Sequence, residues 1–214
     1  MLGLNLATLI ARAVVLLVAF TIHELAHAVT ADYLGDPTPR RMGRITLNPL
    51  AHLDPFGTVM LLLSGFGWAK PVMVNPLNLR GKYRTSMAIV SLAGPASNVL
   101  LAIIFAIPFR LGLMQASMVG SGNSLPSLSF LFVQFVFINI VLALFNFIPV
   151  PPLDGYKILQ GVLPAEMSYY LRPLEQYGFL ILIALIFLLP SFGIDILGWL
   201  VWQPTFRILG LLLS

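Results

Sequence analysis

The chain has 214 residues, of which 58% are hydrophobic and only 9% are charged, where soluble domains carry about 25% charged residues. This composition excludes an intrinsically disordered chain, a nucleic-acid-binding module and an ordinary soluble enzyme, whose surface needs more charge. We therefore expect residues 1–214 to form a single integral membrane domain in the lipid bilayer, with an all-α polytopic fold. The absence of cysteine excludes disulfides, a thiol nucleophile and cysteine metal ligands.

Four apolar segments are candidates for membrane spans. A helix needs about 20 residues to cross the core of a bilayer. The first three are long enough, whereas Pro190 and Asp195 interrupt the fourth. The segment 203–214 is either a short interfacial helix or the end of the broken fourth span, and both alternatives stay open. The predicted spans cover residues 4–33, 87–113, 128–150 and 177–201.

Basic residues concentrate between the first two spans. By the positive-inside rule they place the loop 37–82 in the cytoplasm and the N-terminus outside the cell. The uncharged loop 114–126 is then external. Four spans place the C-terminus outside as well. If the fourth segment is re-entrant instead, the C-terminus lies on the cytoplasmic side. The basic residues of this group are Arg40, Arg41, Arg44, Lys70, Arg80, Lys82 and Arg84.

The loop 37–82 is rich in proline, glycine and asparagine and differs from the rest of the chain. Short runs at 44–47 and 71–74, bounded by turn residues, predict strands of a membrane-associated β-ribbon. The apolar stretch 58–65 is too short to span a membrane. We expect it to dip into the bilayer, where protein or a wet cavity satisfies its backbone.

The first span contains the sequence His-Glu-Leu-Ala-His at residues 23–27. On a helix, His23 and His27 share a face, so both imidazoles can bind one Zn²⁺ and Glu24 can reach the water bound to it. Zinc lowers the pKa of such a water to about 7, and a carboxylate can take its proton during attack on a carbonyl. The alternative is a buried polar cluster that pairs helices by hydrogen bonds.

A hydrolytic zinc usually has three protein ligands, so a third must come from His52 or from one of the few acidic residues. Asp154 stands out because it follows three prolines at the end of the third span, where a broken helix indicates a cavity or a packed site. The first and third spans run in the same direction, which brings His23, His27 and Asp154 to the same cytoplasmic face. The alternative role of Asp154 is the N-cap of a helix that begins there.

Together these motifs resemble the site-2 protease family of intramembrane zinc metalloproteases, in its small bacterial and archaeal form. The resemblance implies a three-helix catalytic core plus at least one further membrane segment. It also implies one Zn²⁺ per chain, bound by His23, His27 and Asp154, with Glu24 as general base. Besides residues 23–27, the segments that carry the resemblance are Asn-x-x-Pro-x-Pro-Pro-Leu-Asp-Gly at 146–155, the small-residue motif at 91–98 and the loop motifs at 43–55 and 69–76.

The same resemblance implies roles for other polar residues. Asn146 and Asn98 are candidates to bind substrate or to stabilise the developing oxyanion, with interhelical hydrogen bonding as the alternative. His52 could line the substrate entrance or ligate zinc in a closed state, and the simpler expectation is a polar loop residue near the lipid headgroups. Gly94 fits a helix-packing position. The loop 37–82 could hold an unwound substrate by pairing with an exposed edge.

We therefore expect an intramembrane zinc endopeptidase. Its substrate would be a membrane protein, cleaved in or near a transmembrane segment at the cytoplasmic side of the cell (inner) membrane. The alternatives are a zinc transporter, which would favour several metal sites along a path, and a non-catalytic zinc-binding scaffold, which the intact Glu24 argues against. The loop 37–82 is too short for the PDZ domain of many relatives, and no CBS domain is expected.

Overall fold

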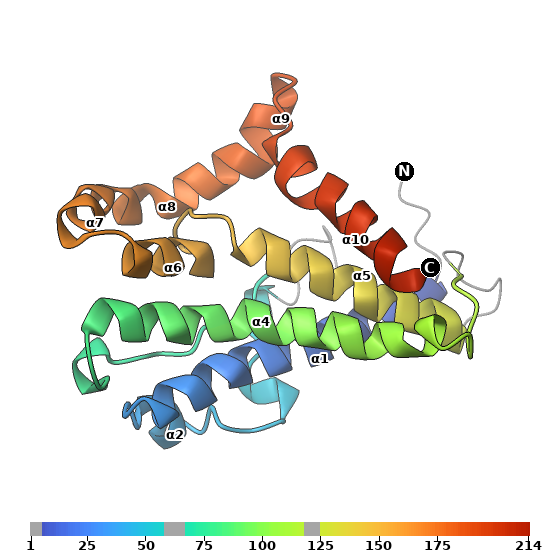
Figure 1. Cartoon of the computed structure of the whole chain (residues 1–214), viewed down its shortest axis with the longest axis horizontal. Coiled ribbons are helices and arrows are strands. Elements are labelled where there is room, and N and C mark those ends of the chain that lie inside the picture. The colour runs from blue at the N-terminus through green and yellow to red at the C-terminus, as the bar shows by residue number, and fades with distance from the viewer. Residues whose placement is uncertain (1–5, 58–66, 118–124) are drawn as a thin grey trace.

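Three long helices lie side by side and form the body of the molecule, as Figure 1 shows: α1 (Leu6–Tyr33), α4 (Tyr83–Arg110) and α5 (Leu128–Asn146). The computed structural model describes residues 6–57, 67–117 and 125–214. At 1.5 Å per residue, the 28 residues of α1 or α4 extend about 42 Å, more than the about 30 Å of a bilayer core. With a fourth segment, Pro173–Ser191, these helices are long and apolar enough to cross a membrane, which confirms the all-α polytopic fold.

One face of α1 is buried along its whole length. Buried residues recur at every fourth position, because residues i and i+4 lie one above the other on a helix. Alanines dominate this stripe, so the neighbouring helices can approach closely. The two histidines continue the stripe, which directs their rings into the protein rather than toward lipid. The stripe consists of Ala7, Ala11, Val15, Ala19, His23, His27 and Ala31.

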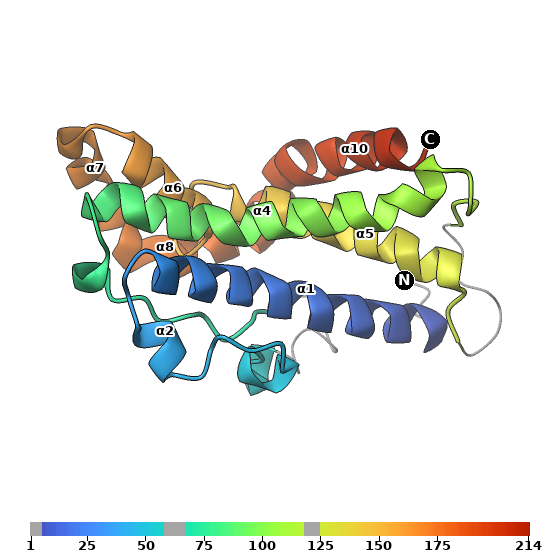
Figure 2. The ribbon, with the colours of Figure 1, turned by 60° about the horizontal axis from the view of Figure 1, so that its bottom comes forward.

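The fourth segment is a broken helix. It comprises α8 (Pro173–Ile183), a π-helical stretch (Ala184–Leu188) and α9 (Leu189–Ser191). A second π-helical stretch (Gly198–Trp202) then leads into α10 (Gln203–Leu213). In Figure 2, α8 lies beside α6 at one end of the molecule, and α10 runs to the other end, where α1 begins.

The packing of the segment 203–214 bears on its two alternatives. Leu209 of α10 is buried against Ala102 and Ala106 of α4 and Val136 of α5. At the tip, the Arg110 guanidinium donates to the backbone carbonyl of Ser214, 3.1 Å away. This packing favours the end of the broken fourth span over a separate interfacial helix.

The described part of the loop between α1 and α4 contains short helical turns and extended chain but no strand. Its elements are α2 (Thr38–Arg41), a 3₁₀ turn at Pro49–Ala51 and another at Pro76–Asn78. Its β pairing is one isolated antiparallel bridge, between Leu53 and Ala69. The stretch 58–65, expected to dip into the bilayer, lies outside the described residues.

The predicted strands at 44–47 and 71–74 are therefore wrong, for an identifiable reason. Side chains rather than a partner strand take up the backbone groups of this loop. In the first run, His52 Nε2 lies 2.9 Å from the carbonyl oxygen of Thr46. In the second, the backbone N–H of Val72 donates to Glu24. The buried Arg44 guanidinium donates to the neighbouring carbonyls of Ala51 and Lys70. Residues near 71–74 are extended, but they pair with no neighbouring strand in the described part of the chain.

Candidate metal centre

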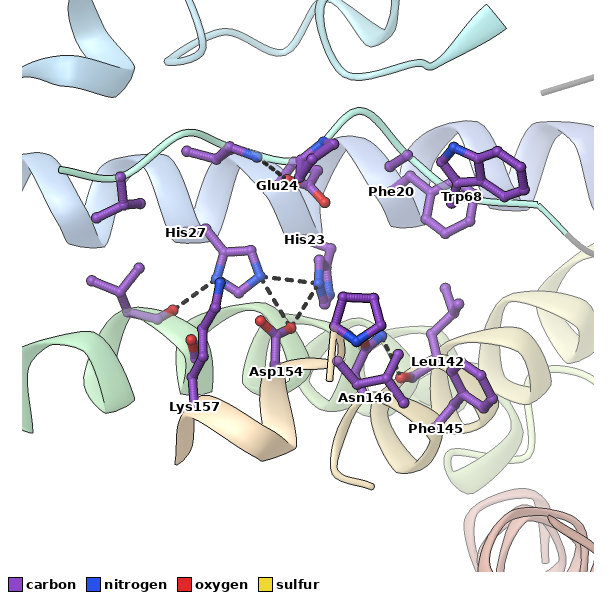
Figure 3. Close-up of a pocket in the computed structure, with 18 of the residues that line it drawn as sticks. Phe20, His23, Glu24, His27, Trp68, Leu142, Phe145, Asn146, Asp154 and Lys157 are labelled. Carbon is purple, nitrogen blue, oxygen red and sulfur yellow. Dashed lines mark hydrogen bonds and ion pairs between the residues drawn. The ribbon is translucent and has the colours of Figure 1, made fainter. Parts of the chain in front are cut away.

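Three predicted ligands converge on one point between α1 and α6 (Asp154–Val162), as Figure 3 shows. The Nε2 atoms of His23 and His27 lie 3.1 Å apart. Asp154 Oδ2 lies 3.3 Å from the His23 nitrogen and 3.2 Å from that of His27. Both histidines are buried, and the Asp154 side chain is 13% exposed. The three ligand atoms form a nearly equilateral triangle.

This triangle fits a tetrahedral zinc ion. Zinc bonds of about 2.0–2.1 Å to nitrogen and oxygen imply ligand atoms about 3.3–3.4 Å apart in a tetrahedron, close to the distances found here. The donors, two imidazoles and one carboxylate, are those of hydrolytic zinc sites. Three protein ligands leave a fourth position for water or substrate.

Asp154 acts as the first residue of α6 rather than as its cap. Leu153 occupies the N-cap position, and α6 has no side-chain cap hydrogen bond. The Asp154 carboxylate faces the histidines instead. Gly155 allows this placement, because a Cβ atom there would lie 2.3 Å from the carbonyl oxygen of Phe147. The Asp-Gly pair therefore lets the start of α6 fold tightly against the end of α5.

Gly94 of α4 is required by the same close packing. A Cβ atom at this position would lie 2.4 Å from His27 Nε2 and 2.6 Å from His23 Cε1. Gly94 therefore lies directly against the histidine rings, where no larger residue fits. The expected packing role holds, with the metal-binding face of α1 as the packed surface.

The rear nitrogen of each histidine has a fixed partner. His23 Nδ1 lies 2.7 Å from Asn98 Oδ1, and His27 Nδ1 lies 2.7 Å from the backbone carbonyl of Val90. Such partners fix the ring orientation of a metal-binding histidine and leave Nε2 for the metal. Asn98 is fully buried behind His23 and is not among the residues that line the adjoining pocket.

Glu24 lies on the same pocket as the ligands but has other partners. Its Oε2 accepts a hydrogen bond from the backbone N–H of Val72, 3.0 Å away, and lies 4.0 Å from Arg44 Nη2. The extended segment around Val72 thus crosses the site beside the carboxylate. Glu24 is held next to the metal-binding face and is not a fourth ligand of the triangle.

The pocket beside the triangle has a volume of about 410 Å³. Asn146 lines it, as the resemblance implies, and the Asn146 side-chain amide donates to the carbonyl of Leu142, one turn earlier on α5. Lys157, one turn after Asp154, brings a positive charge to the same pocket. The other lining residues are mainly apolar and include Phe20, Trp68, Pro71, Phe145, Phe179 and Leu182.

His52 lies away from the pocket. Its side chain is fully buried, and Nε2 lies 2.9 Å from the carbonyl oxygen of Thr46. Its backbone carbonyl accepts from the N–H of Lys70. In this structure His52 therefore ties two parts of the loop together, and it does not line the pocket.

Comparison with known proteins identifies the family. The profile of peptidase family M50 matches residues 11–189. The chain belongs to peptidase family M50. It is 43% identical over 175 residues to YwhC of Bacillus subtilis (strain 168), across 80% of this chain and 78% of that protein. It is 32% identical over 174 residues to Rip2 of Mycolicibacterium smegmatis, across 79% of this chain and 64% of that protein. No solved structure matches significantly.

Both relatives bear the name "Putative zinc metalloprotease". Membership of the M50 family and these names support a metalloprotease with Zn²⁺ as its metal, and the donor set of the triangle agrees with that metal. The expected resemblance to small zinc metalloproteases of the membrane is thereby confirmed.

Two buried polar residues near the triangle were not predicted from the sequence as parts of the site. Asn139 of α5 is fully buried and contacts Asn98, and its signal was a polar side chain within an apolar span, which is usually functional. Arg44 was used only as a topology signal, although it is buried and lies beside Glu24. Its contacts depend on the path of the loop, which no local pattern specifies.

Proposed function

We propose that the protein is an intramembrane zinc endopeptidase that cleaves a peptide bond in or near the transmembrane segment of a membrane protein substrate. The observation that supports it most directly is the triangle of His23, His27 and Asp154 beside Glu24, at the wall of a pocket between membrane-spanning helices. A hydrolytic site between membrane-spanning helices would act on substrates that lie within the membrane.

The residues divide the chemistry between them. His23, His27 and Asp154 would hold Zn²⁺, which, when bound, polarises a water molecule and the scissile carbonyl. Glu24 would accept the proton of the attacking water and pass it to the leaving amine. Asn146 would bind the substrate or stabilise the developing negative charge, because it lines the same pocket.

The extended segment 70–75 would position the substrate. It runs alongside Glu24, and Pro71, Val72 and Val74 line the pocket. An unwound substrate could align with its backbone, as extended peptides do at exposed edges. Since this segment pairs with no strand in the described part of the chain, its remaining backbone groups suit that role.

The orientation in the membrane follows from charge. Basic residues of the loop between α1 and α4 favour the cytoplasm by the positive-inside rule. The triangle lies in the half of α1 nearer that loop. We therefore place the active site toward the cytoplasmic side of the cell membrane, from which water would reach it.

The conservative substitution Glu24→Gln tests the mechanism. The amide keeps the size of the side chain but cannot take a proton, so zinc content should stay near one per chain while cleavage of a co-expressed membrane substrate falls by about 10³-fold or more. Asp154→Ala, by contrast, should lose both cleavage and zinc. Proteomics of membrane fragments, with wild type and Glu24→Gln side by side, would identify the substrate.

Two results would contradict this function. Cleavage by Glu24→Gln at the wild-type rate would exclude Glu24 as the base, and unchanged zinc affinity in Asp154→Ala would exclude Asp154 as a ligand. Zinc flux into proteoliposomes, unaffected by Glu24→Gln, would instead favour a transporter.

A further inference from the structure

A chain of buried amides extends from the metal centre into the core of the helix bundle. Behind His23, the Asn98 side chain on α4 donates from Nδ2 to Asn139 Oδ1 on α5, 2.8 Å away. Asn139 Nδ2 in turn donates to the backbone carbonyl of Phe135, also at 2.8 Å. Both asparagines are 0% exposed, so water does not compete for these bonds.

The direction of every bond in this chain follows from its far end. The carbonyl of Phe135 can only accept, so Asn139 must present its NH₂ group there and its oxygen to Asn98. Asn98 must then donate to Asn139 and present its own oxygen to His23. An oxygen at that place requires a proton on His23 Nδ1, which leaves the lone pair of Nε2 directed at the metal position.

We propose that Asn139 is a positioning residue that acts through Asn98 to hold His23 in the orientation and tautomer that bind zinc. The inference rests on the proposed zinc-protease function. In this proposal Asn139 controls the tautomer of His23 without contacting the metal or the substrate. The proposal also assigns Asn98 to the support of His23, in place of the substrate-binding role considered from the sequence.

The two histidines differ in what fixes them. His27 Nδ1 lies directly against the carbonyl of Val90, which cannot rotate independently of the helix. The partner of His23 is a side-chain amide, whose oxygen and nitrogen can exchange places by rotation. Without Asn139, nothing in the chain of bonds would prevent Asn98 from turning its NH₂ group to His23 and favouring the opposite tautomer. Asn139 removes that freedom.

The test compares zinc affinities of the full-length protein in detergent, measured by competition with a chelator. Asn139→Leu keeps the side-chain size and removes both hydrogen-bonding groups. We expect zinc to bind about 10-fold more weakly, the lower end of the effect of losing the direct partner of a metal ligand, because Asn139 acts through Asn98. Thr21→Val is the matched control, because it removes the side-chain hydrogen bond that the buried Thr21 of α1 donates to the carbonyl of Leu17, and should leave zinc affinity unchanged.

A second substitution separates positioning from packing. A carboxylate can accept at either oxygen, so Asn98→Asp should hold the Nδ1 proton of His23 without help from Asn139. Zinc affinity in Asn98→Asp should therefore change little when Asn139→Leu is added. The His23 Nδ1 proton in ¹⁵N-histidine spectra of zinc-loaded protein, resolvable among three histidines, should exchange faster with solvent in Asn139→Leu alone.

The outcomes are distinct. Wild-type zinc affinity in Asn139→Leu, or an equal loss with and without Asn98→Asp, would overturn the positioning role and leave the proposed function intact. Failure of the wild-type protein to bind zinc would overturn the proposed function itself.

Discussion

At the scale of single residues, the metal centre depends on the absence of a side chain as much as on its ligands. Gly94 leaves the space in which the rings of His23 and His27 meet α4. A glycine inside a helix is unfavourable by about 1 kcal/mol relative to alanine. At Gly94, however, the space for the histidine rings outweighs helix propensity.

We therefore expect Gly94→Ala to weaken zinc binding by at least about 10-fold, because the added methyl group displaces the His27 ring from its metal-binding position. Zinc titration of the purified protein would measure this effect. Gly112→Ala is a useful comparison, since no atom lies within 4 Å of the added Cβ, although its positive φ of 68° is strained for alanine. Unchanged zinc affinity in Gly94→Ala would show that the helices separate without cost.

At the scale of elements, the extended segment 70–75 is held at three points. Arg44 binds the carbonyl of Lys70, Glu24 accepts from the N–H of Val72, and Asp36 accepts from the N–H of Asn75 at 2.6 Å. Asp36 is fully buried and also accepts from Thr38 and Asn78. One carboxylate thus joins the end of α1 to the segment that lines the pocket.

Because of these Asp36 contacts, we expect the stability of the loop to fall in acid. Burial alone would raise the pKa of Asp36, but hydrogen bonds from Asn78, Thr38 and Asn75 outweigh it and lower that pKa below its usual range. A lowered pKa means that Asp36 stabilises the fold at neutral pH, and this contribution is lost as the pH falls through the folded-state pKa.

We expect Asp36→Asn to lower the melting temperature at pH 7 and to flatten its dependence on pH below about 4. Thermal unfolding in detergent at several pH values would show both effects. Glu166→Gln, on α7 (Ala165–Leu171), is a control for general loss of negative charge. A melting temperature of Asp36→Asn that falls in acid as steeply as that of the wild type would contradict this assignment.

That His23, His27 and Asp154 lie together could be predicted from the sequence, and the path of the loop could not, for one physical reason. His23, Glu24 and His27 lie within about one helical turn, so helix geometry alone brings them together, and Asp154 follows a local break marked by prolines. Arg44, His52 and Asn139 each make a contact with a residue at least 18 positions away in the sequence. These contacts depend on how helices and loop pack, which hydrophobic periodicity does not encode.

At the scale of the whole molecule, the helices define two ends. The start of α1, the end of α4 and the end of α10 lie at one end (Figure 1), and the loop with the basic residues joins α1 to α4 at the other. This arrangement agrees with an even number of membrane crossings, in which the whole broken fourth helix makes one crossing. With the orientation proposed above, the C-terminal segment would be external, on the same side as the start of α1.

Because the chain contains no cysteine, single cysteines can test this arrangement directly. In intact cells, a membrane-impermeant thiol reagent should label Leu113→Cys and Ser214→Cys, whereas Lys82→Cys should react only after the membrane is opened. Labelling of Lys82→Cys in intact cells would reverse the orientation. Labelling of Leu113→Cys without Ser214→Cys would show that the broken helix turns back.

The position of Asp154 has one further consequence. Its two histidine partners belong to α1, and the whole of α4 and α5 lies between them in the sequence. A metal ion shared by these side chains therefore fastens the first helix to α6 as a crosslink would, and ligands that bind only the folded state add to its stability. Zinc supply would then govern how long the folded protein survives in the membrane, in addition to whether it can cleave.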